Sequence, residues 1–327
     1  MTTYLSSFAA RTMTKVSYII TLYNKEAFIR PVLDSVLAQT GDFEREIILV
    51  NDGSTDQTLP LIETYAAKHA IIKIITIENS GPAVATNTGI EAATGDFIKF
   101  VDGDDVLCPN STELLMKALK ETGYGLAHSL IKEVDATSEI YQTPSANLTS
   151  YDIEKLPNAL SMMVEKARFN LSCVLVNTAL AKDVGGCDSR FFIQDYSFCL
   201  RMSRITNFVQ VPVVLAYAPK ESASRVSGFG AGAQVLHDLN MALGHFIADF
   251  PDLPVGIRKK LLQRATSRAW RWAKRQEKKS IFSIEFLNYI LAKCGFNTSN
   301  PEKLVFASCE TFRRTTSIRF PQHISNR

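Results

Sequence analysis

The sequence lacks long apolar runs, closely spaced cysteines, histidine clusters and a phosphate-binding P-loop, and each absence argues against a class of protein. No stretch approaches the roughly 18–20 apolar residues that a helix needs to span a bilayer. The six cysteines form no C-x-x-C pair and the five histidines have no metal-ligand spacing, which argues against a zinc site. Cysteines scattered through apolar segments favour reduced, mostly buried thiols and a cytoplasmic protein.

The amino-terminal residues carry arginine and hydroxyl side chains but lack the apolar core of a signal peptide. We therefore expect residues 1–14 to form a disordered or loosely docked tail. The chain has 327 residues, of which 46% are hydrophobic and 21% charged. This composition is typical of a globular protein with one large domain, or of a catalytic domain with an appendage.

Short apolar runs alternate with helical patterns over the first hundred residues. The runs are rich in β-branched and aromatic side chains, which predicts buried strands. The segments between them repeat apolar side chains at the spacing of an amphipathic helix, most clearly over 29–37. The alternation predicts an α/β fold with a mainly parallel sheet flanked by helices. The expected strands cover residues 16–22, 46–50, 71–77 and 97–101.

Each expected strand ends in a polar cluster. The four clusters lie at residues 23–26, 51–56, 79–82 and 102–105. Because the carboxyl ends of parallel strands meet at one edge of a sheet, we expect the clusters to converge there, where open α/β sheets bind their ligands. Hydrophobic patterning alone does not require four such clusters, so the sequence predicts a site at this edge.

The last of these clusters concentrates negative charge. Asp102, Asp104 and Asp105 fall within four positions at the end of the apolar run 97–101. A hard cation that carries phosphate oxygens would explain them, since such ions take oxygen ligands. The alternative is an acidic turn in which Gly103 supplies a positive φ.

The later sequence divides near Pro219. Before it, weaker patterns predict helices over 113–120, 179–184 and 195–205 and strands over 126–134, 172–176 and 209–217. After it, only helices are expected, over 233–250, 256–279 and 281–293. We therefore expect a catalytic domain over 15–218 and a helical extension over 219–327, which would serve as a lid or contact the acceptor or a membrane.

Five stretches in this order resemble the family 2 glycosyltransferases, inverting enzymes with the GT-A fold. The resemblance covers about residues 16–217 and implies that fold, a Rossmann-like sheet flanked by helices. The stretches read I-I-T-L-Y-N-K-E, I-I-L-V-N-D-G-S-T-D, E-N-S-G-P-A-V-A-T-N-T-G-I, G-D-F-I-K-F-V-D-G-D-D and G-G-C-D-S-R-F-F-I-Q-D-Y-S-F-C-L-R.

The resemblance implies roles for individual residues. Asp102-Gly103-Asp104 is similar to the family's D-x-D motif, which implies Mn²⁺ or Mg²⁺ on Asp104 and Asp102, while Asp105 braces the turn. Asp52 would hydrogen-bond the base of the nucleotide. The remaining residues implied in nucleotide-sugar binding are Thr21, Tyr23, Glu26, Asn79, Gly81 and Asn87, together with Asp102 and Gly103.

Asp195 matches the position of the catalytic base in the family. Glycosyl transfer requires a carboxylate to take the proton of the attacking hydroxyl, although Asp195 could instead cap the following helix. The chain departs from the family pattern at Thr86, Gln194 and Ser197, and Lys220 stands near a position where relatives often carry a histidine. Lys220 could neutralise a diphosphate directly.

The resemblance therefore implies transfer of a sugar from a nucleoside diphosphate sugar, with UDP favoured, to a hydroxyl acceptor. A glycan or lipid-linked glycan in bacterial surface polysaccharide or glycolipid synthesis is the natural acceptor. A catalytically impaired protein that binds glycans or nucleotide sugars is the alternative. A nucleotidyltransferase is a further rival, but the glycine-rich basic loop that such enzymes place after the first strand is absent.

The positive charge of the chain is local. Residues 258–279 hold ten Lys or Arg and one acid, Glu277, so this segment carries +9 and the rest of the chain −6, for a net charge of +3. A basic helix with Trp270 and Trp272 predicts peripheral contact with an anionic membrane, at its inner face in a cytoplasmic enzyme. The alternative is a helix packed on the catalytic domain. No recognised motif supports nucleic-acid binding.

Overall fold

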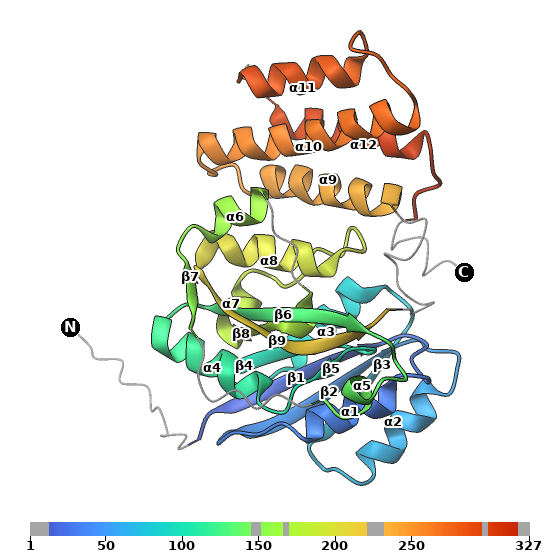
Figure 1. Ribbon diagram of the computed structural model, residues 1–327, viewed down its shortest axis with the longest axis vertical. Coiled ribbons are helices and arrows are strands. Elements are labelled where there is room, and N and C mark those ends of the chain that lie inside the picture. The colour runs from blue at the N-terminus through green and yellow to red at the C-terminus, as the bar shows by residue number, and fades with distance from the viewer. Residues whose placement is uncertain (1–12, 145–151, 166–169, 221–231, 296–299, 320–327) are drawn as a thin grey trace, which may run out of the picture.

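The computed structural model describes residues 13–144, 152–165, 170–220, 232–295 and 300–319. Most of the predicted amino-terminal tail falls outside these residues, as does most of the glycine-rich stretch 228–233, whose sequence suits either a lid or a plain linker. Figure 1 shows an α/β unit at one end of the molecule and a stack of carboxyl-terminal helices at the other.

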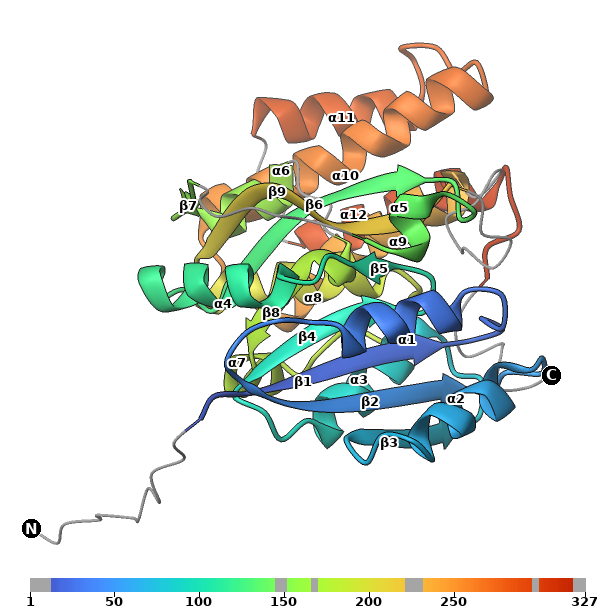
Figure 2. The ribbon, with the colours of Figure 1, turned by 60° about the horizontal axis from the view of Figure 1, so that its bottom comes forward.

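The central sheet begins as the sequence predicts. Strands β1 (Lys15–Leu22), β2 (Glu44–Asp52), β3 (Ile72–Ile77) and β4 (Phe97–Asp102) are parallel, in the order β3-β2-β1-β4. The apolar runs of β1, β2 and β4 are buried on both faces, which is typical of parallel strands covered by helices, whereas the edge strand β3 is only partly buried. Their carboxyl ends therefore share one edge of the sheet, visible in Figure 2.

Beyond β4 the sheet is mixed rather than mainly parallel. The order continues β8-β6-β9-β5, in which β6 and β9 are parallel while the pairs β4–β8, β8–β6 and β9–β5 are antiparallel. A further strand, β7, pairs antiparallel with β9. These strands are β5 (Val106–Leu107), β6 (Leu126–Val134), β7 (Glu154–Leu156), β8 (Val174–Asn177) and β9 (Phe208–Pro219).

Helices cover both faces of the sheet, so the α/β prediction is confirmed. Alternate residues of β1 divide between two buried apolar clusters: Tyr18 and Ile20 join Leu33 and Leu115 on one face, and Ile19 joins a second cluster on the other. The helices of this unit are α1 (Ile29–Leu37), α2 (Thr58–Ala66), α3 (Pro82–Ala92), α4 (Ser111–Thr122), α5 (Glu139–Gln142), α6 (Ala159–Glu165), α7 (Thr178–Asp183) and α8 (Gln194–Ile205).

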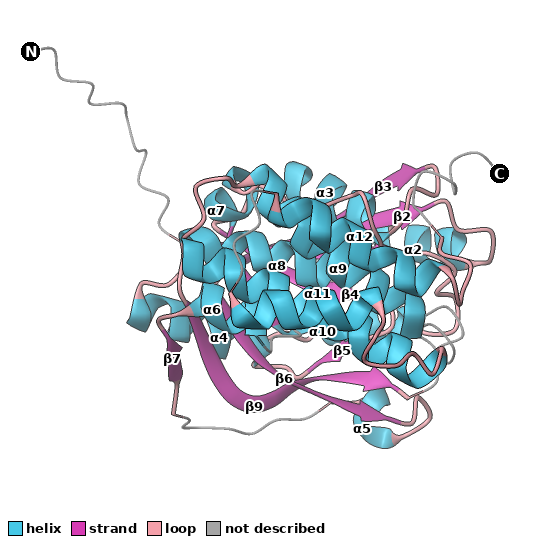
Figure 3. Ribbon diagram, turned by 90° about the horizontal axis from the view of Figure 1, so that it is seen from above, coloured by secondary structure: helices cyan, strands magenta, loops and turns pink. Residues whose placement is uncertain are grey.

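The carboxyl-terminal helices stack above α8 (Figure 1), and seen from above they overlie it (Figure 3). They are α9 (Gly232–Asp249), α10 (Val255–Gln276), α11 (Ile284–Cys294) and α12 (Pro301–Arg313); the last was not predicted. The second cluster runs without interruption from Phe100 and Phe198 into Leu243 and Leu261. The helical extension therefore shares its apolar core with one face of the sheet. No helix among the described residues is both long enough and apolar enough to cross a bilayer.

Candidate functional site

The loops that follow β1 and β2 are held together by hydrogen bonds. The side chain of Asn24, whose φ is +52°, accepts a bond from the Thr55 N–H at 2.8 Å. The carboxylate of Glu26 accepts a bond from the Gln57 N–H at the start of α2, also at 2.8 Å. Glu26 therefore lies close to the predicted site, and its hydrogen bond to Gln57 stabilises the conformation of the loop.

Asp52 connects the second loop to the third. This nearly buried carboxylate ends β2 and accepts bonds from the N–H groups of Ser80, at 2.7 Å, and Gly81, at 3.0 Å. Burial raises the pKa of Asp52, against the lowering effect of the two bonds. Gly53 permits the approach, since a Cβ there would lie 2.8 Å from the backbone nitrogen of Asn79. The structure thus brings Asp52, Asn79 and Gly81 together.

The acidic turn follows β4 beside the end of β1. Asp102 pairs with Thr21 in the register of these two strands. The interpretation that Gly103 supplies a positive φ is wrong, because its φ is not among the positive values. Instead, space excludes a side chain: a Cβ on Gly103 would lie 2.8 Å from the carbonyl oxygen of Thr21 and 2.7 Å from a methyl carbon of Leu22.

Asp104 is paired with a lysine from the first loop. The Lys25 Nζ lies 2.7 Å from Asp104 Oδ2, and the two side chains are only 11% and 6% exposed. The hydroxyl of the buried Tyr141 donates to the Asp104 carbonyl oxygen at 2.6 Å. As predicted, Asp105 braces the turn: its carboxylate accepts a bond from the Asn170 side chain at 3.0 Å.

A second lysine lies beneath the turn. Lys99 of β4 is fully buried, and its ammonium group donates to the carbonyl oxygens of Ser172 and Phe100. Burial lowers the pKa of Lys99 to about 8, although the carboxylates of Asp102 and Asp105 and the thiol of Cys173 counteract this effect. Sequence reasoning gave no role to Lys25 or Lys99. For Lys99, the signal available in the sequence was a lysine within the apolar run of a predicted strand.

Asp195 lies in the first turn of α8. It is half-buried, and its Oδ1 accepts a bond from the Tyr196 N–H at 2.7 Å. The residue that precedes the helix is Ile193, so Asp195 is not the N-cap, although it does accept from a backbone N–H of the first turn. Burial raises the pKa of the Cys187 thiol, and the carboxylates of Asp195 and Asp102 raise it further.

Asn87 holds the loop that carries Cys187. Its side-chain amide donates to the Cys187 carbonyl oxygen at 2.9 Å and accepts from the Cys187 N–H at 2.7 Å. Asp188, the next residue, pairs with Arg190 and with Arg201 of α8. These contacts fix the path of the chain toward Asp195. The polar atoms of Asn87 thus already have protein partners, which makes its contribution to a ligand pocket indirect.

The other predicted residues lie around this centre. Tyr23 is 41% exposed directly after β1. Lys220 follows β9, where its ammonium group lies 3.4 Å from an Asp135 carboxylate oxygen. Among the described residues no three His, Cys, Asp or Glu side chains form a metal cluster. Two carboxylates, Asp102 and Asp104, nevertheless suit a hard divalent ion that receives its other ligands from phosphate and water.

The family model described as glycosyl transferase family 2 matches residues 17–184, which is 168 of the 327 residues and therefore more than half of the chain. The chain belongs to glycosyl transferase family 2. The matched residues include the first four strand ends, with Asp52 and the acidic turn, whereas Asp195 follows them.

This glycosyltransferase is similar to curated bacterial proteins that are named as uncharacterized glycosyltransferases. It is 34% identical over 160 residues to the uncharacterized glycosyltransferase YibD of Escherichia coli, a match over 47% of this chain and 45% of YibD. It is 50% identical over 90 residues to EpsJ of Bacillus subtilis, over 28% of this chain and 26% of EpsJ. The chain thus spans less than half of the curated relatives that it matches.

Solved structures share the fold over nearly the whole chain. TarS of S. aureus, residues 1–349 in complex with UDP-GlcNAc, aligns with a TM-score of 0.61 at 18% identity, over 93% of both chains. The mannosyltransferase PcManGT of Pyrobaculum calidifontis, in complex with GDP-Man and Mn²⁺, aligns with a TM-score of 0.53 at 16% identity, over 93% of this chain and 86% of that one. The GT-A fold prediction is confirmed.

Proposed function

We propose that this glycosyltransferase moves a sugar from a nucleoside diphosphate sugar to a hydroxyl acceptor with inversion at the anomeric carbon. The observation that supports the proposal is the meeting of Asp52 and the acidic turn at the carboxyl ends of β2 and β4, where the Lys25–Asp104 pair joins the first loop to the turn. UDP is the favoured nucleotide because TarS, a fold neighbour, binds UDP-GlcNAc.

The nucleotide would occupy the edge between β1, β2 and β4. The second lone pairs of the Asp52 oxygens are available for a base N–H, since each oxygen accepts one bond from the backbone. Thr21 and Tyr23 would border the base and ribose, and the backbone of 79–81 would close the pocket. Glu26 and Asn87 would act indirectly, by holding these loops in place.

Asp104 and Asp102 would hold Mn²⁺ or Mg²⁺ beside the diphosphate. The ion, when bound, stabilises the negative charge that develops on the diphosphate as the glycosidic bond breaks. Lys25 would add a positive charge at the same place, because its ammonium group already lies against Asp104. The buried Lys99 would offset part of the repulsion among the three carboxylates from below.

Asp195 would be the catalytic base. The acceptor oxygen would bond to the anomeric carbon as the bond from that carbon to the diphosphate oxygen breaks, and the hydroxyl proton would pass to the Asp195 carboxylate. The products are the glycoside, with inverted configuration, and the nucleoside diphosphate. Two departures from the family pattern do not remove the base: Gln194 and Ser197 contact each other through a hydrogen bond of 3.0 Å, and neither replaces Asp195.

A glycan or lipid-linked glycan at the cytoplasmic face of the membrane is the proposed acceptor, in bacterial surface polysaccharide or glycolipid synthesis. The bacterial relatives support the setting. A protein that binds a nucleotide sugar without transfer is the alternative.

Release of nucleoside diphosphate from a panel of UDP- and GDP-linked sugars, with Mn²⁺ or with EDTA, tests the proposal. We expect release from one donor that requires metal and is lost in Asp104→Ala. If no donor turns over, calorimetry with UDP and Mn²⁺ separates the alternatives. Binding that is lost in Asp52→Ala would support the non-catalytic alternative, and no binding at all would contradict the donor site.

A further inference from the structure

The outermost helix of the molecule exposes an apolar surface. Figures 1 and 2 place α11 at the end farthest from the parallel strands. Only Glu285 and Ala292 of this helix are buried, while Ile284 and Leu287 are 58% and 50% exposed. Phe282, directly before the helix, is 92% exposed beside the exposed Ile281. Four large apolar side chains over seven positions therefore lie in water, which is unusual for chance exposure.

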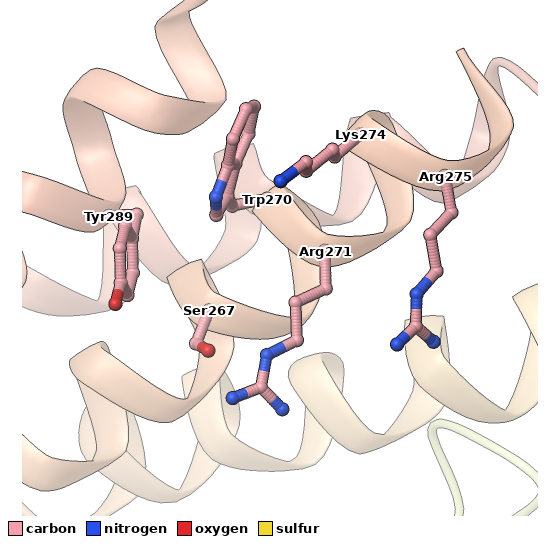
Figure 4. Close-up of a pocket in the computed structure, with 6 residues that line it drawn as sticks. All are labelled: Ser267, Trp270, Arg271, Lys274, Arg275 and Tyr289. Carbon is pink, nitrogen blue, oxygen red and sulfur yellow. The ribbon is translucent and has the colours of Figure 1, made fainter. Parts of the chain in front are cut away.

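Positive charge lies on the neighbouring helix α10. A pocket of about 430 Å³ between α10 and α11 is lined by Arg271, Lys274 and Arg275 of α10, and by Ser267, Trp270 and Tyr289. Figure 4 shows the guanidinium groups of Arg271 and Arg275 pointing to the same side and the Lys274 ammonium group directed toward Trp270. In the part of the chain that the structure describes, these three cations have no carboxylate partner.

Glu277 and Glu285 are ion-paired within the chain, Glu277 also with Lys279 at 3.9 Å. Arg314 lies 3.0 Å from a carboxylate oxygen of Glu277 and 2.5 Å from one of Glu285. Lys278 and Lys279 follow α10 and complete the run of positive charge before Ile281. The charge of this end is therefore strongly positive and is not cancelled locally.

The apolar stripe of α10 itself is buried. Leu261, Leu262, Ala265, Ala269 and Ala273 pack inside the helical stack. The expectation that α10 lies flat on a membrane through its own apolar stripe is therefore not supported, because that stripe is covered. The exposed apolar side chains belong to the turn after α10 and to α11.

We propose that this basic–apolar edge binds the surface of an anionic phospholipid membrane. The edge consists of Arg271, Lys274, Arg275, Lys278, Ile281, Phe282, Ile284 and Leu287. Phe282 and its apolar neighbours enter the boundary between headgroups and acyl chains, and the cations bind headgroup phosphates. The proposal goes beyond the transfer reaction and does not depend on it.

Charge decides between a membrane and a second copy of the chain as the occupant. A symmetric dimer across this edge would bring the same cations of two copies together, and like charges in contact are unfavourable. An anionic surface complements them instead. Each Lys or Arg near such a surface contributes roughly 1 kcal/mol, which is about a fivefold change in binding.

Co-sedimentation of the full chain with vesicles tests the proposal. We expect pelleting with vesicles that contain phosphatidylglycerol, weak pelleting with pure phosphatidylcholine, and release by high salt. The triple variant Arg271→Gln, Lys274→Gln, Arg275→Gln should weaken partitioning on the order of 100-fold. The matched control, Lys68→Gln, Lys73→Gln, Lys117→Gln, removes the same charge from the α/β unit and should change partitioning severalfold less.

The apolar part is tested separately. Phe282→Ser should reduce partitioning at least about tenfold without loss of folding, since Phe282 is exposed, whereas Ile71→Ser, at an exposed position on the α/β unit, should have no effect. Equal partitioning of Phe282→Ser and the parent, or equal binding to both vesicle types, would overturn the proposal. So would a dimer in sedimentation velocity that Phe282→Ser dissociates, with no vesicle binding by the parent.

Discussion

Lys25 and Asp104 form an almost fully buried ion pair, with the Lys25 Nζ 2.7 Å from Asp104 Oδ2. The pair joins the first strand end to the acidic turn, so the proposed metal ligand already has a cation beside it. A lysine in this place offsets the charge of the turn when no diphosphate is bound. It can also contact the diphosphate once the donor enters.

Replacement of this lysine tests both roles. Lys25→Met should lower kcat/KM for the donor on the order of 100-fold, because a charge at the leaving group is lost. It should also tighten Mn²⁺ binding measured by calorimetry, since Asp104 loses a competing cation. Lys73→Met, at an exposed lysine of the α/β unit, is the control. Unchanged donor turnover in Lys25→Met would show that the ion pair is structural only.

Asp195→Asn should lower kcat by about 10²–10⁴-fold while KM for the donor changes little, because the amide cannot take a proton but has nearly the same shape. The Asn oxygen can still accept the bond from Tyr196 N–H, so the melting temperature should stay close to that of the parent. Asp252→Asn changes an exposed acid outside the site and should leave kcat unaltered. A parental kcat in Asp195→Asn would exclude it as the base.

Gly103→Ala should weaken donor binding at least about tenfold. A Cβ at 2.8 Å from the Thr21 carbonyl oxygen forces the acidic turn to move away from β1, and a displacement of a fraction of an ångström is enough to disturb a binding site. Gly256→Ala is the control, because a Cβ there meets nothing within 4 Å. Calorimetry with UDP and Mn²⁺ makes the comparison, and equal affinities would show that the turn tolerates the shift.

Glu46 predicts how stability depends on pH. Burial alone would raise its pKa, but hydrogen bonds from Ser17, Lys15 and Thr94 outweigh that effect and lower the pKa to about 2. A lowered folded-state pKa gives stability that is present above the unfolded-state pKa of roughly 4.3 and is lost as pH falls through the folded-state value. Between about pH 4 and 2, the free energy of unfolding of Glu46→Gln should therefore fall less than that of the parent.

Urea denaturation at several pH values measures this difference, with Glu63→Gln at an exposed position of α2 as the control. Parallel pH profiles for Glu46→Gln and the parent would contradict the assignment. If the free energy of unfolding also fell less with pH in the control, the cause would be net charge and not the hydrogen bonds that Glu46 makes.

The sequence predicted the parallel half of the sheet well because each of its strands carries its own apolar run and ends in a polar cluster. It did not predict β5 and β7, which have two and three residues and form only because β9 pairs with them. Helix α12 had a readable signal in the spacing of Val305, Cys309 and Phe312, which are buried.

Within the site, the sequence identified the acids but not their partners. The convergence of Asp52 with the backbone of 80–81 follows from strand order, so it could be predicted. The pairing of Lys25 with Asp104 depends on where a long side chain points after the chain has turned. The two hydrogen bonds between the Asn87 side chain and the Cys187 backbone join residues 100 positions apart. Neither leaves a periodic pattern in the sequence.

The apolar cluster that continues from Phe198 into Leu243 has a consequence for any attempt to divide the protein. A chain cut after Pro219 would leave the outer face of α8 bare, so the amino-terminal piece should aggregate or open near Asp195, the proposed base. If the helical extension were exchanged between relatives, the residues of α8 that pack against its inner face would have to be exchanged with it. Substitutions on the outer surface of α11, of which only Glu285 and Ala292 are buried, would leave this shared core intact.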